Sequence, residues 1–159
     1  MMLQDPKNLD CVLEIPSFAP EYRHATIAIL KGRGLAAKDR SGFVRALSSS
    51  DPYFVVKFKD RKYKSEVKPK TLDPEWNSQP FDAGMVTDAE PKLLKIKVFD
   101  HDYVGSDDFM GIVMIPGYAI FNLGPGQHMY WFPLSASDKK EYRGEAVSGE
   151  ILLDIRVEA

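Results

Sequence analysis

The sequence predicts an all-β domain, folded as an eight-stranded antiparallel sandwich. Two observations carry this prediction: apolar residues recur with a period of two along the chain, and turn residues separate these runs at short intervals. Runs with helical periodicity are scarce. A chain of 159 residues supports one domain with a substantial core and is too short for two ordinary domains.

Four runs alternate clearly and are expected to be strands, namely residues 25–30, 54–58, 94–98 and 151–157. Four shorter candidates complete the set, at residues 62–67, 77–81, 110–115 and 128–132. Glycine, proline and aspartate clusters fall between them, as turns require. Residues 1–22 are interpreted as an N-terminal arm or an additional edge element, and residues 23–159 as the folded domain.

Composition restricts the class of protein more than it identifies a partner. The net charge is −2, and Cys11 is the only cysteine, which excludes an internal disulfide framework and suits a reducing compartment. No run has the length of a membrane span, and the charged N-terminus does not resemble a signal peptide. The expected location is therefore cytoplasmic, with any membrane contact reversible and peripheral.

Aspartates gather at predicted strand ends. Asp39 and Asp51 lie between the first two strands, and Asp100, Asp102, Asp107 and Asp108 lie between the fifth and sixth. Because alternate connections of a sandwich meet at one end, these carboxylates are expected to come together. Like charges in close contact raise one another's pKa, and a divalent cation relieves the repulsion. Oxygen ligands in irregular loops favour Ca²⁺ over Mg²⁺ or Zn²⁺.

Three segments, in this order and spacing, resemble the C2 domain family of calcium-dependent phospholipid-binding β-sandwiches. They are residues 50–53 (SDPY), 71–77 (TLDPEWN) and 98–111 (VFDHDYVGSDDFMG). The resemblance covers roughly residues 24–157. A strand at the C-terminus, with eight strands countable without residues 1–22, resembles the permuted (type II) topology of that family.

The resemblance implies that five aspartates hold two or three Ca²⁺ ions: Asp39, Asp51, Asp100, Asp102 and Asp108. Asp107 is out of register and is interpreted as a solvated charge or a group outside the ligand set. Asp39 and Asp51 stand further apart than is usual in the family. The extra residues bring apolar side chains to the loop tips, so the expected membrane-contacting residues are Phe43, Val44, Leu47, Tyr103 and Val104.

Residues 57–70 carry seven basic and two acidic side chains, a local charge of +5. In C2 domains the corresponding strands bind acidic headgroups, phosphoinositides among them, and each lysine near an anionic leaflet contributes about 1 kcal/mol. The expected headgroup residues are Lys57, Lys59, Lys62, Lys64, Lys68 and Lys70. The alternative is a solvated face that discourages edge pairing.

The sequence therefore predicts a module that is recruited to anionic phospholipid, phosphatidylserine above all, when Ca²⁺ is present. Nucleic-acid binding would need a broader basic surface with stacking aromatic side chains. The serines and histidines have no catalytic spacing, so no enzymatic activity is expected. Two alternatives stay open: a calcium-independent C2 domain that binds a protein partner, and the targeting module of a larger lipid-signalling enzyme or trafficking protein.

Overall fold

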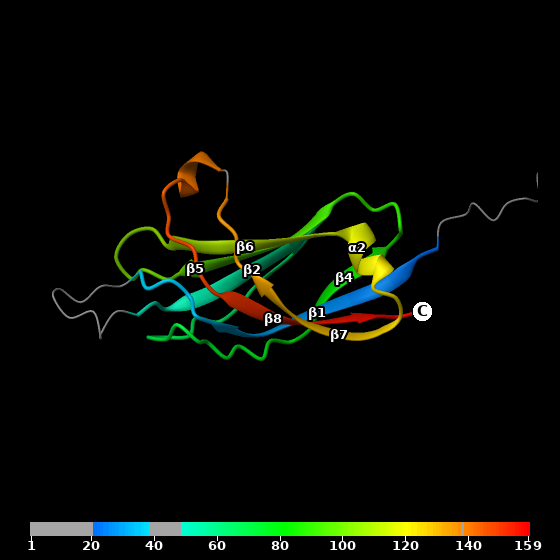
Figure 1. Ribbon diagram of the computed structural model, residues 1–159, viewed down its shortest axis with the longest axis horizontal. Helices are drawn as coiled ribbons and strands as arrows, with labels where there is room; N and C mark the ends of the chain where they lie inside the picture. Colours follow the sequence, from blue (N-terminus) through cyan, green and yellow to red (C-terminus); the bar gives the residue numbers. More distant parts are fainter. Residues whose placement is uncertain (1–20, 39–48, 138) are drawn as a thin grey trace, which may run out of the picture.

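The computed structural model describes residues 21–38, 49–137 and 139–159, which contain eight strands (Figure 1). In chain order they are β1 (Arg23–Arg33), β2 (Pro52–Phe58), β3 (Arg61–Lys64), β4 (Phe81–Val86), β5 (Leu93–Asp100), β6 (Asp108–Pro116), β7 (Gly126–Pro133) and β8 (Glu150–Val157). A short helix, α2 (Gly117–Asn122), follows β6, and a 3-10 turn, η2 (Lys140–Tyr142), lies between β7 and β8. No helix in this described part of the chain is long and apolar enough to cross a bilayer.

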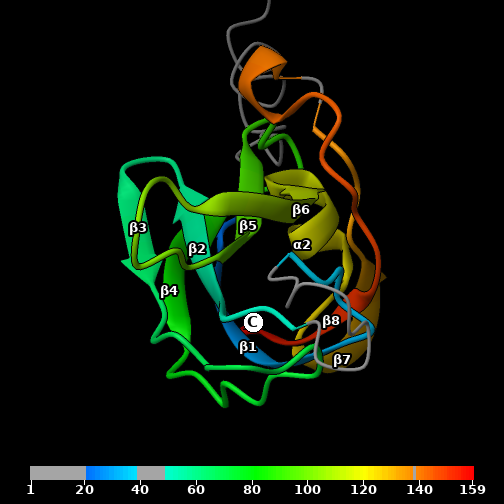
Figure 2. The ribbon, with the colours of Figure 1, turned by 90° about the vertical axis from the view of Figure 1, so that its left-hand side faces the viewer.

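The strands form two antiparallel sheets, with the orders β4-β1-β8-β7 and β3-β2-β5-β6. Figure 2 shows the two sheets facing each other as the layers of a sandwich. The prediction of an eight-stranded antiparallel sandwich is therefore confirmed. Strand β8 pairs with β1 on one side and with β7 on the other, so it lies inside its sheet. The assignment to the permuted variant stays a prediction.

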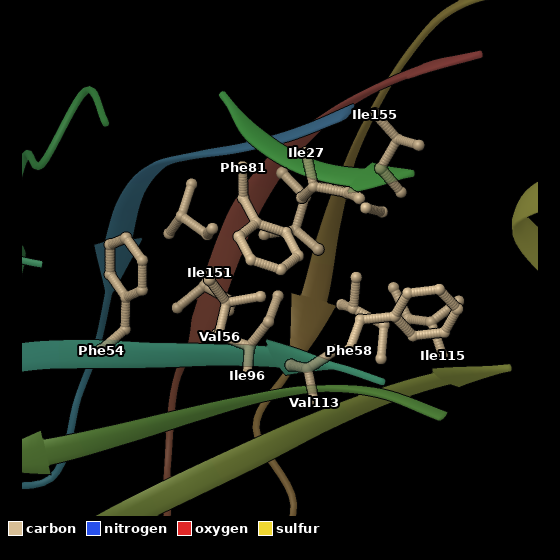
Figure 3. Close-up of a cluster of buried hydrophobic side chains, with 14 of the residues drawn as sticks. Ile27, Phe54, Val56, Phe58, Phe81, Ile96, Val113, Ile115, Ile151 and Ile155 are labelled. Atoms are coloured by element: carbon tan, nitrogen blue, oxygen red, sulfur yellow. The ribbon is translucent and has the colours of Figure 1, made fainter. Parts of the chain in front are cut away.

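The core lies between the two sheets, and alternate residues of their strands point into it. On β2, Phe54, Val56 and Phe58 are fully buried, whereas Lys57 between them is exposed on the other face. Figure 3 shows these side chains meeting Ile27, Phe81, Ile151 and Ile155 from the opposite sheet. Each large apolar side chain buried in this way contributes about 1.5–3 kcal/mol. One face of β2 thus packs in the core, and Lys57 lies on the other face.

The fourth strand does not lie where the sequence predicts it. Residues 77–81 were expected to be a strand, but β4 begins only at Phe81. The chain before it crosses the end of β1, where the N–H groups of Trp76 and Asn77 both donate to the carbonyl of Leu30. Asn77 has a φ of 43°, which interrupts extended backbone. The expected strand over residues 62–67 is also shorter, because β3 ends at Lys64.

Residues 139–149, here called the strap, carry the chain from β7 back to β8 across the second sheet. The ring of Tyr142 stacks on Phe109 of β6, with 4.3 Å between ring centroids. Val147 packs against the core. A Cβ atom on Gly111 would lie 2.7 Å from Leu134, directly after β7, and 3.1 Å from Val147 of the strap, so glycine lets both segments approach β6 closely.

The strap ends at Gly149, where the chain turns into β8. Gly149 has a φ of 88°, and a Cβ atom there would lie 2.4 Å from the carbonyl oxygen of Arg33 and 2.6 Å from that of Gly34. Both contacts are with backbone atoms, which cannot move without disturbing β1. Gly144 has nearly the same φ, 85°, but no atom within 4 Å.

Gly149→Ala is expected to destabilise the domain much more than Gly144→Ala. Both substitutions add the left-handed backbone strain of about 1–2 kcal/mol, but only the first also forces a backbone collision. Urea unfolding followed by tryptophan fluorescence measures the difference. The two variants should differ by at least about 2 kcal/mol, within the range of severe substitutions. Equal losses would mean that the close approach of Gly149 to β1 is not a constraint on the fold.

Candidate functional site

The described residues of the β1–β2 connection lie beside the β5–β6 connection at one end of the sandwich, on the left in Figure 1. Hydrogen bonds join them directly. The N–H of Asp51 donates to Oδ1 of Asp100 over 2.7 Å, and the N–H of His101 donates to the carbonyl of Asp51 over 2.9 Å. The gathering of these two connections, on which the metal hypothesis depends, is thus present in the structure.

Four of the five predicted calcium ligands lie at this loop end, and Asp39 lies outside the described residues. Asp100 is fully buried, and Asp51, Asp102 and Asp108 are partly exposed. Oδ1 of Asp51 accepts the N–H of Lys70, and Oδ1 of Asp102 accepts the N–H of Val104. Backbone N–H groups therefore fix the orientation of three of these carboxylates.

Within the described ranges, no three acidic, histidine or cysteine side chains are arranged to hold a metal ion. The chemistry of the donors nevertheless fits a hard cation. Burial raises the pKa of the Asp108 carboxyl above its ordinary value, and the charges of Glu145, Asp102 and Asp107 raise it further. Crowded carboxylates of this kind form a set of oxygen donors that Ca²⁺ suits better than softer metals. Asp51, Asp100, Asp102 and Asp108 are the described residues that would hold it.

Of the two interpretations of Asp107, a solvated charge or a group outside the ligand set, its hydrogen bonds favour the second. Its Oδ1 accepts the N–H of Asp102 over 2.9 Å, and its Oδ2 accepts the hydroxyl of Tyr53. Burial raises its pKa, but these two hydrogen bonds and the nearby His101 outweigh burial, so the pKa lies below its ordinary value. The ring of His101 is also half-buried, and its Nδ1 lies 3.4 Å from Oδ1 of Asp107. Asp107 therefore anchors the loop from inside.

The tip of the β5–β6 connection is apolar and open to solvent. Tyr103 is 75% exposed and Val104 is 87% exposed, the two largest exposures among the large apolar side chains described. Phe43, Val44 and Leu47, the other predicted membrane contacts, lie outside the described residues. Exposed apolar side chains rimmed by polar groups are typical of a surface that binds a protein or a membrane.

A basic groove runs along the outer face of the second sheet. Strand register sets Lys62, Lys57 and Lys95 in one row across β3, β2 and β5, and sets Lys64, Val55 and Lys97 in the next row. The groove has a volume of about 330 Å³ and is lined by Val55, Lys57, Lys62, Lys95, Lys97, Phe99 and Lys139. Burial, together with the charges of Lys139 and Lys95, lowers the pKa of Lys97 below its ordinary value. This surface repels cations and is suited to anions.

The six lysines predicted to bind headgroups divide into two sets. Lys57, Lys62 and Lys64 lie on the grooved face. Lys59 lines an adjoining hollow with Lys57 and Lys95 and forms an ion pair with Glu90 of the β4–β5 connection at 2.5 Å. Lys68 pairs with Glu66 at 2.6 Å, and the backbone of Lys70 belongs to the loop end. The groove gains Lys95, Lys97 and Lys139, which sequence reasoning missed. The alternation of Lys95 and Lys97 on β5 was a signal for two of them, but the sequence contains none for Lys139.

Sequence reasoning also missed a partly buried ion pair at the loop end. Nζ of Lys38 lies 2.8 Å from Oε2 of Glu145 on the strap, and the Lys38 side chain is only 9% exposed. The two residues are 107 positions apart, and neither belongs to a recognisable motif.

Comparison with known proteins agrees with this geometry. The family model described as "C2 domain" matches residues 23–134. Among curated proteins, the chain is 34% identical over 124 residues to Arrestin domain-containing protein B of Dictyostelium discoideum, covering 77% of this chain and 19% of that protein. It is 31% identical over 130 residues to Ras GTPase-activating protein 4 of Mus musculus, covering 82% and 15%. The chain thus spans less than a fifth of either relative.

Solved structures show the same fold. A calcium-bound structure of two C2 domains of Extended-Synaptotagmin 2 matches with a TM-score of 0.68 at 24% identity, covering 87% of this chain and 46% of that one. A C2 domain of plant Extended Synaptotagmin 1 matches with a TM-score of 0.65 at 22% identity, covering 85% and 93%. With the matched family model extending over most of the sandwich, the conclusion is direct: this chain belongs to the C2 domain family.

Proposed function

We propose that this C2 domain is a membrane-targeting module that binds anionic phospholipid when Ca²⁺ is present. The observation that supports this most is the coincidence of acidic and apolar side chains at one end of the sandwich. The carboxylates of Asp51, Asp100, Asp102 and Asp108 lie directly beside the exposed tip formed by Tyr103 and Val104. Its relatives include Synaptotagmin-3 of Arabidopsis thaliana, at 35% identity over 104 residues.

In the proposed mechanism, the loop end changes the sign of its charge. Without a cation, its carboxylates repel an anionic lipid surface. Ca²⁺, when bound, would cancel this charge and offer coordination positions to lipid phosphate or carboxylate oxygens. Tyr103 and Val104 then enter the interface, where each buried apolar side chain contributes about 1.5–3 kcal/mol at most. Such a switch needs only a change of charge on a rigid scaffold.

In this proposal, Asp107 and Tyr53 keep the β5–β6 connection rigid. Tyr53 is buried on β2, its ring stacks on Phe99 with 5.6 Å between centroids, and its hydroxyl donates to Asp107. Burial raises the pKa of this hydroxyl, and the hydrogen bond to Asp107 adds to the shift. Through Asp107 the sheet therefore holds the N–H of Asp102 in place.

The basic groove supplies a second contact with lipid. All of its lysines except Lys139 of the strap lie on the sheet that contains β5 and β6, so one orientation of the domain brings both surfaces toward a membrane. Anionic headgroups, phosphoinositides included, are the proposed occupants of the groove.

Asp100→Asn/Asp102→Asn is expected to abolish sedimentation with phosphatidylserine vesicles in Ca²⁺. Asparagine keeps the side-chain shape and an acceptor oxygen but removes the charge that holds a divalent cation. Wild-type protein should pellet in Ca²⁺ and stay in solution in excess EGTA. The matched control is Asp60→Asn/Asp88→Asn, which removes two exposed aspartates from connections at the other end of the sandwich. Equal pelleting of wild type in Ca²⁺ and EGTA would contradict calcium dependence.

In EGTA, Lys57→Ala/Lys97→Ala is expected to weaken binding to phosphoinositide-containing vesicles by about tenfold or more. The reason is that each lysine near an anionic surface contributes about 1 kcal/mol to binding. Lys68→Ala/Lys70→Ala, which removes the same charge outside the groove, should have little effect. A binding titration by vesicle sedimentation compares the two. Equal losses would show that general positive charge, and not the groove, binds the lipid. If no vesicle binds any form of the chain, a protein partner becomes the better hypothesis.

Tyr53→Phe is expected to lower the free energy of unfolding by about 1–2 kcal/mol, because the charged Asp107 loses a hydrogen-bond donor. It should also weaken Ca²⁺ binding, since the loop that carries Asp102 is less firmly held. Urea unfolding and calorimetric Ca²⁺ titration measure the two effects. Tyr63→Phe is the matched control, because Tyr63 lies on edge strand β3 with its side chain 38% exposed and on the opposite face of the strand from Lys62 and Lys64. Unchanged stability in Tyr53→Phe would mean that the hydrogen bond to Asp107 does not anchor the loop.

A further inference from the structure

Each of the two described sheets has two edge strands, and three of these edges are protected against pairing with another chain. Strand β3 (RKYK) has three basic side chains and is exposed along its whole length, a composition that discourages pairing. The chain after β7 covers the edge of β6, where Ser135 and Ile112 exchange two backbone hydrogen bonds. At the edge of β4, the side chains of Lys59 and Arg61 donate to backbone carbonyls of that strand.

Strand β7 is the fourth edge, and no segment among the described residues covers it. Its sequence, GQHMYWFP, contains no lysine, arginine or acidic residue. Met129 is 48% exposed and Tyr130 is 50% exposed, although both lie within the strand. An uncharged edge of this length with exposed apolar side chains is suited to pairing with a further strand.

The register of β7 on β8 identifies the backbone groups that point away from the sheet. The N–H of Leu134 donates to the carbonyl of Gly149, in continuation of the pairing between the two strands. In an antiparallel strand, a residue directs its N–H and C=O to one side and the next residue directs them to the other. The even-numbered residues of β7 therefore face β8. Gln127, Met129 and Trp131 direct both backbone groups outward.

The side chains on either side of Met129 are held against the sheet. Nε2 of Gln127 donates to Oδ2 of Asp154 over 3.1 Å. The guanidinium carbon of Arg33 lies 3.8 Å from the centroid of the Trp131 ring. These contacts fix the middle of β7 in its extended form, so an incoming strand would meet an edge that is already ordered.

We infer that β7 is a docking edge for a second copy of this chain, and that two copies pair their β7 strands antiparallel about a two-fold axis at Met129. A second copy fits because the edge has no charge, so it meets itself without the repulsion that would oppose the pairing of two β3 strands. With Met129 opposite Met129 of the other copy, Gln127 faces Trp131, and the outward backbone groups of all three residues find partners. A shift of two residues would set Pro133, which has no N–H, opposite Gln127.

Sedimentation velocity of the whole chain over a range of concentrations, in EGTA and without lipid, tests the inference. The weight-average sedimentation coefficient of wild type should rise with concentration toward that of a dimer. Met129→Lys should raise the dissociation constant by about tenfold or more, because it sets two ammonium groups opposite each other at the axis. The matched control is Met85→Lys on β4 of the same sheet, since Met85 is also 48% exposed. It should leave the association unchanged.

A disulfide cross-link tests the register. Cys11→Ser removes the only native thiol, so a cysteine introduced in that background can link only to its own copy. Met129→Cys should form a covalent dimer on mild oxidation, because directly opposed residues of this kind have Cα atoms about 5.5 Å apart, within reach of a disulfide. Met85→Cys should stay monomeric under the same conditions. Electrophoresis without reducing agent measures both, and melting temperatures confirm that every variant is folded.

Loss of association in Met129→Lys alone, together with the Met129→Cys cross-link, supports the inference. A wild-type sedimentation coefficient that stays at the monomer value at every concentration overturns it and leaves the β7 edge to a strand of a different protein. Equal weakening by Met129→Lys and Met85→Lys also overturns it, because the copies would then associate through net charge or another surface. Since these assays contain neither Ca²⁺ nor lipid, their failure leaves the proposed membrane function standing.

Discussion

Every strand of this sandwich must bury one of its two faces against the opposite sheet, and the remaining features depend on this constraint. Because side chains alternate along a strand, burying Phe54, Val56 and Phe58 places Lys57 and Val55 outside. The same rule applied to β5 puts Lys95 and Lys97 on the same outer face. The basic groove is thus a product of the register that builds the core, and a slip of one residue would bury its lysines.

The sandwich also brings an acidic region and a basic region close together. Carboxylates occupy the loop end, and lysines occupy the adjacent outer face of the sheet. Between them lie the stacked rings of Tyr53 and Phe99, with the ammonium group of Lys64 over the Tyr53 ring at 4.6 Å from its centroid. Tyr53 thus touches both regions, because its hydroxyl donates to Asp107 while its ring faces a lysine. The aromatic layer keeps the two charged regions at fixed positions relative to each other.

Much of this arrangement could be predicted from the sequence, and the failures have physical reasons. Alternation predicted β2, β5 and β8 to within two residues at either end. It failed for β4, whose Ala83 and Gly84 have little preference for extended structure and which exists because it pairs with β1. Four of the five predicted calcium ligands lie at the expected loop end, because β5 and β6 form a hairpin and β2 pairs with β5, which brings the start of β2 beside that hairpin's connection. The role of Asp107 and the pair of Lys38 with Glu145 could not be predicted, because each depends on contacts between segments far apart in the chain.

The central position of β8 has a consequence for how the domain folds. Strand β1 pairs with β4 on one side, but its other neighbour, β8, is the last strand of the sandwich, and Arg33 and Glu150 are 117 residues apart in the chain. Closing so long a loop is costly in entropy, so pairings of this kind slow folding relative to local hairpins. The hairpin of β2 and β3 can form early, whereas one edge of β1 lacks its partner until β8 arrives. During that interval the exposed edge and apolar face of β1 are the parts of the chain most open to aggregation or to capture by chaperones.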